Sequence, residues 1–106
     1  MSTARRLDRR RAAVLFADIV GFTPLCERAG VEHAYAIVTG CLKLLDGVAR
    51  RHGGVVDKYL GDALMAVFGI PAPLDNPSAA AIAAALEMQR TVDAYNRQVN
   101  PPVPLA

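Results

Sequence analysis

Residues 55–68 read VVDKYLGDALMAVF, and this stretch decides the fold. It consists of two short strand-like runs on either side of the dipeptide Gly61-Asp62. A glycine in the first position of a two-residue loop favours a tight turn between antiparallel strands. The stretch therefore predicts a β-hairpin. Regular alternation along its first strand would put three side chains on one face, those of Val56, Lys58 and Leu60.

An earlier apolar run, residues 12–20, reads AAVLFADIV and carries a single charge at Asp18. A run this short, followed by Gly21, predicts a buried strand. Period-two alternation would place one set of side chains on a common face, those of Val14, Phe16 and Asp18.

Helical patterns fill most of the remaining chain. Thr23 followed by Pro24 predicts a helix start, with Thr23 as the N-cap and Pro24 in the first turn. Gly30 interrupts this helix, and a longer one is expected from Val31 to the glycines at 53 and 54. Its apolar stripe would consist of Ala34, Ile37, Cys41, Leu44 or Leu45, and Val48.

Asn76 followed by Pro77 repeats the signal of a cap and then a proline, and predicts a helix that runs to about Val99. Its buried stripe is expected to contain Ile82, Ala85, Met88, Val92 and Tyr95. Tyr35 and Tyr59 are likewise expected to be packing residues.

The order strand, helix, strand, strand, helix is that of a ferredoxin-like βαββαβ domain whose last strand is missing. We therefore expect an α+β domain with one sheet and one helical layer, truncated before the later strands. Its predicted extent is residues 12–106.

Composition supports one globular domain. The chain has 106 residues, of which 53% are hydrophobic and 21% are charged, with a net charge of +2. This balance excludes a disordered chain and a dedicated nucleic-acid binder. Residues 1–11 contain five arginines and one aspartate. They form either a solvated linker, which we favour, or an arm that contacts phosphate or an acidic membrane surface.

The chain carries no apolar run long enough for a membrane span, and no signal peptide follows Met1. Cys26 and Cys41 match neither a zinc pair nor a redox motif, so both are expected to be reduced thiols packed on helices. We expect the domain to work in the cytoplasm.

Asp18 and Asp62 are the residues most in need of explanation. They lie 44 positions apart, but in a ferredoxin-like sheet the end of the first strand lies beside the hairpin turn. Two carboxylates beside a helix start would suit Mg²⁺, which takes oxygen ligands and substrate phosphates. Alternatively, Asp18 forms a salt bridge with an arginine, and Asp62 is an ordinary turn residue.

Two motifs resemble class III adenylate and guanylate cyclase catalytic domains. LFADIVGFT, residues 15–23, is similar to the first metal-binding motif of that family, and DKYLGDALMAVFG, residues 57–69, is similar to the second. The loop and alanine-rich helix of residues 71–96 also follow the family pattern. The resemblance covers about residues 12–100, which correspond to the N-terminal part of a cyclase domain.

The resemblance implies formation of 3′,5′-cyclic AMP and pyrophosphate from ATP by a two-metal mechanism. Asp18 and Asp62 would hold two Mg²⁺ or Mn²⁺ ions, with the carbonyl of Ile19 as a further ligand. Backbone amides of Gly21, Phe22 and Thr23 would bind the triphosphate. Lys58 would read the base, because lysine only donates and adenine offers an acceptor at N1. Otherwise, Lys58 is a solvated lysine on a strand.

The resemblance also implies a partner. In the family the site forms between two domains, as a homodimer or a heterodimer. The later segment of the domain supplies a second base-reading residue, an asparagine and an arginine, which have no counterpart here. We therefore expect this chain alone to be inactive, whether it is a fragment, a shortened domain or a natural half-domain. The alternative is a catalytically silent nucleotide-binding or regulatory half-domain.

Overall fold

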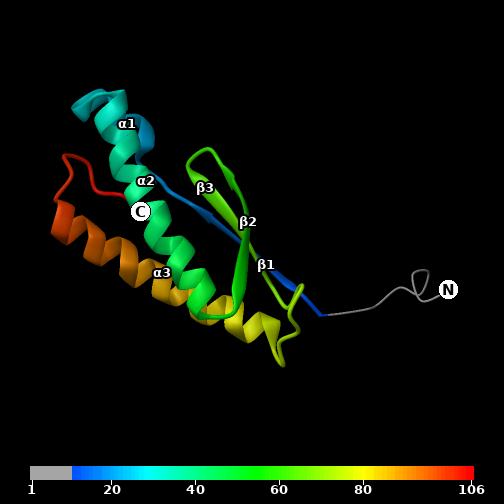
Figure 1. Cartoon of the computed structure of the whole chain (residues 1–106). Helices are drawn as coiled ribbons and strands as arrows, with labels where there is room; N and C mark the ends of the chain where they lie inside the picture. Colours follow the sequence, from blue (N-terminus) through cyan, green and yellow to red (C-terminus); the bar gives the residue numbers. More distant parts are fainter. Residues whose placement is uncertain (1–10) are drawn as a thin grey trace.

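The computed structural model describes residues 11–106, so the predicted basic arm lies outside the described residues except for Arg11. The described part forms strands and helices in the predicted order, with the first helical region divided at Gly30 (Figure 1). The elements are β1 (Ala13–Asp18), α1 (Phe22–Ala29), α2 (Val31–Arg51), β2 (Gly54–Leu60), β3 (Ala63–Phe68) and α3 (Pro77–Val99).

The sheet is antiparallel, with β3 between β1 and β2. The ladder between β1 and β3 runs from Ala13 opposite Phe68 to Asp18 opposite Ala63. The tight turn at Gly61 and Asp62 joins β2 to β3, as predicted. This topology confirms the predicted α+β class and the beginning of a ferredoxin-like arrangement.

Helices α2 and α3 cover one face of the sheet (Figure 1). The β3 side chains on that face are fully buried, namely those of Leu64, Ala66 and Phe68. The predicted stripe of α2 is buried against them, with Leu45 rather than Leu44 as its member. Both cysteines are free thiols on helices, Cys26 half-buried and Cys41 buried, as expected.

The opposite face of the sheet, which we call the open face, carries three rows of paired residues. These rows are Asp18–Ala63–Leu60, Phe16–Met65–Lys58 and Val14–Val67–Val55. The predicted common face of Val14, Phe16 and Asp18 is thereby confirmed.

The predicted common face of Val56, Lys58 and Leu60 is wrong for Val56. A register shift between Val56 and Lys58 leaves Asp57 as an extra residue, which is a β-bulge. The bulge turns Val56 toward the helices, where it pairs with Ala66, and puts Lys58 and Leu60 on the open face with Val55.

Two further details of the helices differ from prediction. Thr23 is not the N-cap of α1, because the helix begins at Phe22 after Gly21, and no side chain caps it. The stripe of α3 differs from prediction only near its start: Met88 and Val92 are buried as predicted, but Ile82 is 61% exposed. The small side chains of Ala81 and Ala84 take the buried positions instead.

The cap of α3 is as predicted. Asn76 Oδ1 accepts a hydrogen bond from the Ala79 backbone N–H at 3.0 Å, and Pro77 begins the helix. After α3 the chain turns back along the helix, and Asn96 holds it by bonding both the N–H and the carbonyl of Leu105 at 2.9 and 2.8 Å. Ala106 and Val20 then exchange two backbone hydrogen bonds. The last residues therefore lie beside the loop that follows β1.

Candidate active site

The two aspartates lie on neighbouring chain segments. Asp18 ends β1 opposite Ala63, and the next residue, Ile19, donates its N–H to the Asp62 carbonyl oxygen at 3.0 Å. The end of the first strand thus lies beside the hairpin turn, as the topology predicted. Asp18 is exposed and Asp62 is half-buried.

The salt bridge considered for Asp18 is not seen among the described residues. Within residues 11–106, neither carboxylate forms an ion pair. The same part of the chain contains no group of three or more His, Cys, Asp or Glu side chains that could hold a metal ion together. A closed zinc site is therefore not formed by the described residues, whereas Mg²⁺ typically uses one or two carboxylates and completes its shell with water and phosphate oxygens.

The loop between β1 and α1 exposes backbone amides next to the aspartates. The first helical bond of α1 runs from the Leu25 N–H to the Gly21 carbonyl oxygen at 3.0 Å. The N–H groups of Phe22 and Thr23 precede it and have no acceptor within the helix. Such groups, with the positive end of the helix dipole, bind anions.

Gly21 is required by this loop for two reasons. Its φ of 112° lies in the region that side chains rarely adopt, and an added Cβ would come within 3.2 Å of the Pro104 carbonyl oxygen. A side chain at position 21 would therefore be strained and would crowd the C-terminal segment.

Lys58 lies farther away than the other predicted site residues. It is on β2, two strands from Asp18, and this corresponds to about 10 Å across the sheet. Its side chain is 54% exposed, and the Nζ atom lies 3.6 Å from Asp57 Oδ2. The structure therefore brings together the chain segments that carry Asp18, Asp62 and the start of α1, while Lys58 shares only the open face with Asp18.

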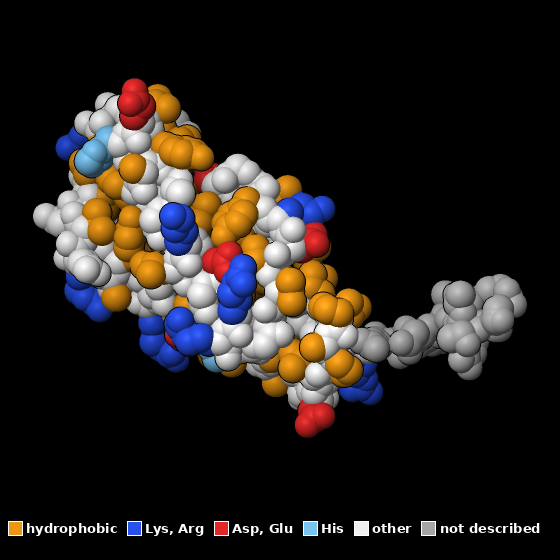
Figure 2. Space-filling view, viewed as in Figure 1, with side chains coloured by type: hydrophobic (Ala, Val, Ile, Leu, Met, Phe, Trp, Pro, Cys, Tyr) orange, Lys and Arg blue, Asp and Glu red, His pale blue; other side chains and the backbone are white. Residues whose placement is uncertain are grey.

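Large hydrophobic side chains are exposed on the open face, among them those of Val14, Phe16, Val55 and Leu60. Figure 2 shows hydrophobic side chains reaching the surface in several groups between charged ones. Contiguous exposed apolar surface commonly marks an interaction site.

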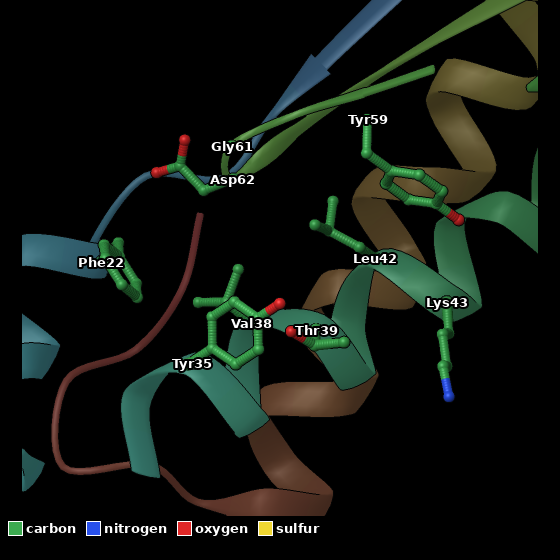
Figure 3. A pocket seen from close by; sticks show the side chains of 9 residues that line it. All are labelled: Phe22, Tyr35, Val38, Thr39, Leu42, Lys43, Tyr59, Gly61 and Asp62. Atoms are coloured by element: carbon green, nitrogen blue, oxygen red, sulfur yellow. The ribbon is translucent and has the colours of Figure 1, made fainter. Parts of the chain in front are cut away.

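A cavity of about 630 Å³ lies on the other side of the hairpin tip, between it and helices α1 and α2 (Figure 3). Asp62 and Gly61 form one end of it, and its walls are mostly apolar. Sequence reasoning missed this cavity, because Tyr35 and Tyr59 were expected to be packing residues. Both line the cavity and are exposed, whereas Tyr95 is half-buried and donates to the Ile37 carbonyl oxygen at 2.6 Å.

Tyr59 has a second contact that sequence reasoning did not find. Its hydroxyl donates to Asp46 Oδ2 at 2.5 Å, and Arg50 bonds the other oxygen of the same carboxylate. Burial alone would raise the pKa of Asp46, but the hydrogen bonds from Arg50 and Tyr59 and the charge of Arg50 lower it below its usual value. The hydrogen bond to Asp46 in turn raises the pKa of Tyr59.

Comparison with known proteins identifies the family of this chain. The model of the adenylate and guanylate cyclase catalytic domain matches residues 6–104. The chain belongs to this family. The cyclase domain is 33% identical to an adenylate cyclase of Anabaena cylindrica over 82% of the chain, and 41% identical to an uncharacterized protein of Mycobacterium tuberculosis over 72%.

Solved cyclase structures share the fold of this cyclase domain. The guanylyl cyclase Cya2 matches with a TM-score of 0.79 and 28% identity over 92% of the chain. The chain spans 52% of that structure, 16% of the Anabaena enzyme and 14% of the mycobacterial protein. No helix within residues 11–106 is long and apolar enough to cross a membrane.

Proposed function

We propose that this cyclase domain forms 3′,5′-cyclic AMP and pyrophosphate from ATP, for signal transduction in the cytoplasm. The observation that carries the proposal is the hydrogen bond from Ile19 N–H to the Asp62 carbonyl oxygen, which joins the two aspartate-bearing segments at the start of α1. This junction combines acidic oxygens with free amides, and both are needed for a metal–triphosphate complex.

Asp18 and Asp62 would hold two Mg²⁺ or Mn²⁺ ions, with the Ile19 carbonyl oxygen as an additional ligand. The ions, when bound, lower the pKa of the ribose 3′-hydroxyl and offset charge on the pyrophosphate that leaves. The protein contributes by placing the backbones of the two residues: Asp18 by pairing with Ala63 and Asp62 by the tight turn.

The amides of Gly21, Phe22 and Thr23 would bind oxygens of the triphosphate. They lie at the junction of the loop and α1, shortly after Asp18, so one phosphate chain would contact both these amides and a metal ion held by Asp18. This arrangement orients the α-phosphate toward the attacking hydroxyl.

Lys58 would select the base by donating a hydrogen bond to adenine N1, where guanine carries a hydrogen. The family includes enzymes for both nucleotides, and the similarity to an Anabaena adenylate cyclase supports ATP. Lys58→Glu is expected to weaken ATP use more than folding.

A second cyclase domain would pack against the open face, as a homodimer or a heterodimer. The support is the apolar character of this face, whose exposed Val14 and Phe16 would be buried by a partner. Since the asparagine and arginine of the family site come from the later part of the domain, we expect turnover only when that part is present.

The test begins with metal binding by the chain. At Mn²⁺ concentrations one hundredfold above its dissociation constant, a bound ion stabilises the fold by about 2.7 kcal/mol. For a domain of this size the melting temperature would rise by roughly 10 °C or more. Asp18→Asn and Asp62→Asn should each remove most of this rise. Asp75→Asn, in an exposed loop, is the matched control and should retain it.

Turnover is then measured in a complete cyclase domain that contains this chain. Either asparagine variant should abolish formation of cyclic AMP, and near-normal turnover by one of them would refute the metal assignment. If calorimetry instead shows that ATP and Mn²⁺ bind but no cyclic product forms, the domain is a silent nucleotide-binding module.

A further inference from the structure

The part of β2 that carries Lys58 is paired within the sheet on one side only. β2 is an edge strand, so its backbone pairs only with β3, and its last four residues, 57–60, are all exposed. The bulge at Asp57 interrupts the pairing just before Lys58. A bulge disrupts the ladder locally and bends the strand, so a contact from β2 to a helix helps to fix the faces of the residues that follow it.

Tyr59 supplies that contact. Consecutive residues of a strand point to opposite faces, so Tyr59, paired with Leu64, lies on the helix-facing side while Lys58 lies on the open face. The Tyr59–Asp46 bond is the only side-chain hydrogen bond between β2 and a helix within residues 11–106.

The acceptor is well placed to fix the strand. The side chain of Asp46 is only 16% exposed, and Arg50, one turn further along α2, holds its other oxygen. The low pKa of Asp46 keeps its carboxylate ionised at neutral pH. A hydroxyl that donates to an ionised carboxylate forms a shorter and stronger bond than a neutral pair, and the 2.5 Å distance fits this class.

We propose that Tyr59 and Asp46 are positioning residues for Lys58. Their bond anchors the strand after the bulge to α2, and a Tyr59 held on the helix side keeps Lys58 on the open face. This inference rests on the proposed role of Lys58 in base selection. Tyr59 and Asp46 would then influence specificity from the helix-facing side of the sheet, opposite the open face on which Lys58 lies.

The experiment compares Tyr59→Phe with Tyr95→Phe. Each variant removes one tyrosine hydroxyl that bonds a helix, but Tyr95 joins α3 to α2 and does not contact β2. Asp46→Asn serves as the conservative variant, since its amide oxygen can still accept from Tyr59. Circular dichroism establishes that each variant is folded.

The first readout is the position of Lys58. Lys58 and Met65 are paired on the open face, and the Cβ atoms of such pairs lie about 5 Å apart. NMR of the isotope-labelled chain should therefore show nuclear Overhauser contacts between their side chains. These contacts should weaken in Tyr59→Phe and persist in Tyr95→Phe and Asp46→Asn. Contacts of full intensity in Tyr59→Phe would overturn the proposal.

The second readout is the ratio of the dissociation constants for ATP and GTP, measured by calorimetry with Mn²⁺. Loss of the charge-assisted bond should reduce the preference for ATP by about fivefold in Tyr59→Phe, while Tyr95→Phe leaves it unchanged. Equal effects of the two variants would reduce the Tyr59 bond to a general structural role. If the Lys58–Met65 contacts weaken but Lys58→Ala leaves the nucleotide preference unchanged, the positioning holds and the role of Lys58 in base selection fails.

Discussion

Gly54 begins the hairpin that carries Asp62, and the structure predicts that this position does not accept a side chain. An added Cβ would lie 2.6 Å from Phe68 Cε2, 2.7 Å from Phe68 Cζ and 3.0 Å from the Ala49 carbonyl oxygen. Phe68 is fully buried beneath α2 and α3, so its ring cannot turn out into solvent to make room. The Gly54→Ala substitution should therefore strain the core.

Overpacking of this kind costs typically 1–3 kcal/mol, and we expect about 2 kcal/mol for Gly54→Ala. The matched control is Gly47→Ala within α2. The nearest atom to its Cβ would be Arg51 Nη1 at 3.5 Å, an ordinary contact. Because alanine is the better helix former, Gly47→Ala should stabilise the domain by up to about 1 kcal/mol.

The two alanine variants should thus differ by about 3 kcal/mol in the free energy of unfolding, with opposite signs relative to the parent chain. Urea unfolding followed by circular dichroism measures both values. A Gly54→Ala variant as stable as the parent chain would show that β2 and Phe68 are not packed as described. A strongly destabilised Gly47→Ala would contradict the free space beside Gly47 in α2.

Two further predictions concern titration and reactivity. Hydrogen bonds from Arg51 and His52 lower the pKa of Glu87, and the pKa of Asp46 is lowered as well. Both carboxylates therefore stabilise the folded state when they are ionised, and this stability is lost as the pH falls through their folded pKa values. The urea concentration at the unfolding midpoint should therefore decrease below about pH 4. In the double variant Asp46→Asn, Glu87→Gln this decrease with pH should be shallower, and an equally steep decrease would contradict the hydrogen bonds of these two carboxylates. Burial raises the pKa of Cys41 to about 11. Iodoacetamide at neutral pH should therefore label Cys26 first and Cys41 only after unfolding in urea. Equal labelling rates of the two thiols in the folded chain would contradict the packing of Cys41.

Several features of the fold could be predicted because their causes are local. The turn at Gly61 and Asp62 depends on backbone freedom at one residue, and the cap at Asn76 depends on a side chain and an amide three residues later. Alternation along β1 is unbroken, so counting from Val14 gave the correct face for Asp18. The proximity of the Asp18 and Asp62 segments then followed from the topology.

Other features were decided only when the elements packed together. Alternation could not place Val56, because the bulge at Asp57 adds a residue to β2, and only pairing with β3 reveals it. At the start of α3, the face turned toward the core carries Ala81 and Ala84, and the larger Ile82 is exposed. Helical periodicity alone does not predict this choice, because it does not say how closely the helix packs.

The sequence by itself predicted the candidate site residues, and it determined the order of the elements and the two acidic segments that meet. Tertiary structure alone decided that Tyr59 reaches Asp46, since this bond joins a strand to a helix across 13 positions and depends on the bulge between them. Patterns that repeat along one element can be counted from residue types, but contacts between elements depend on how far each element is rotated when it packs.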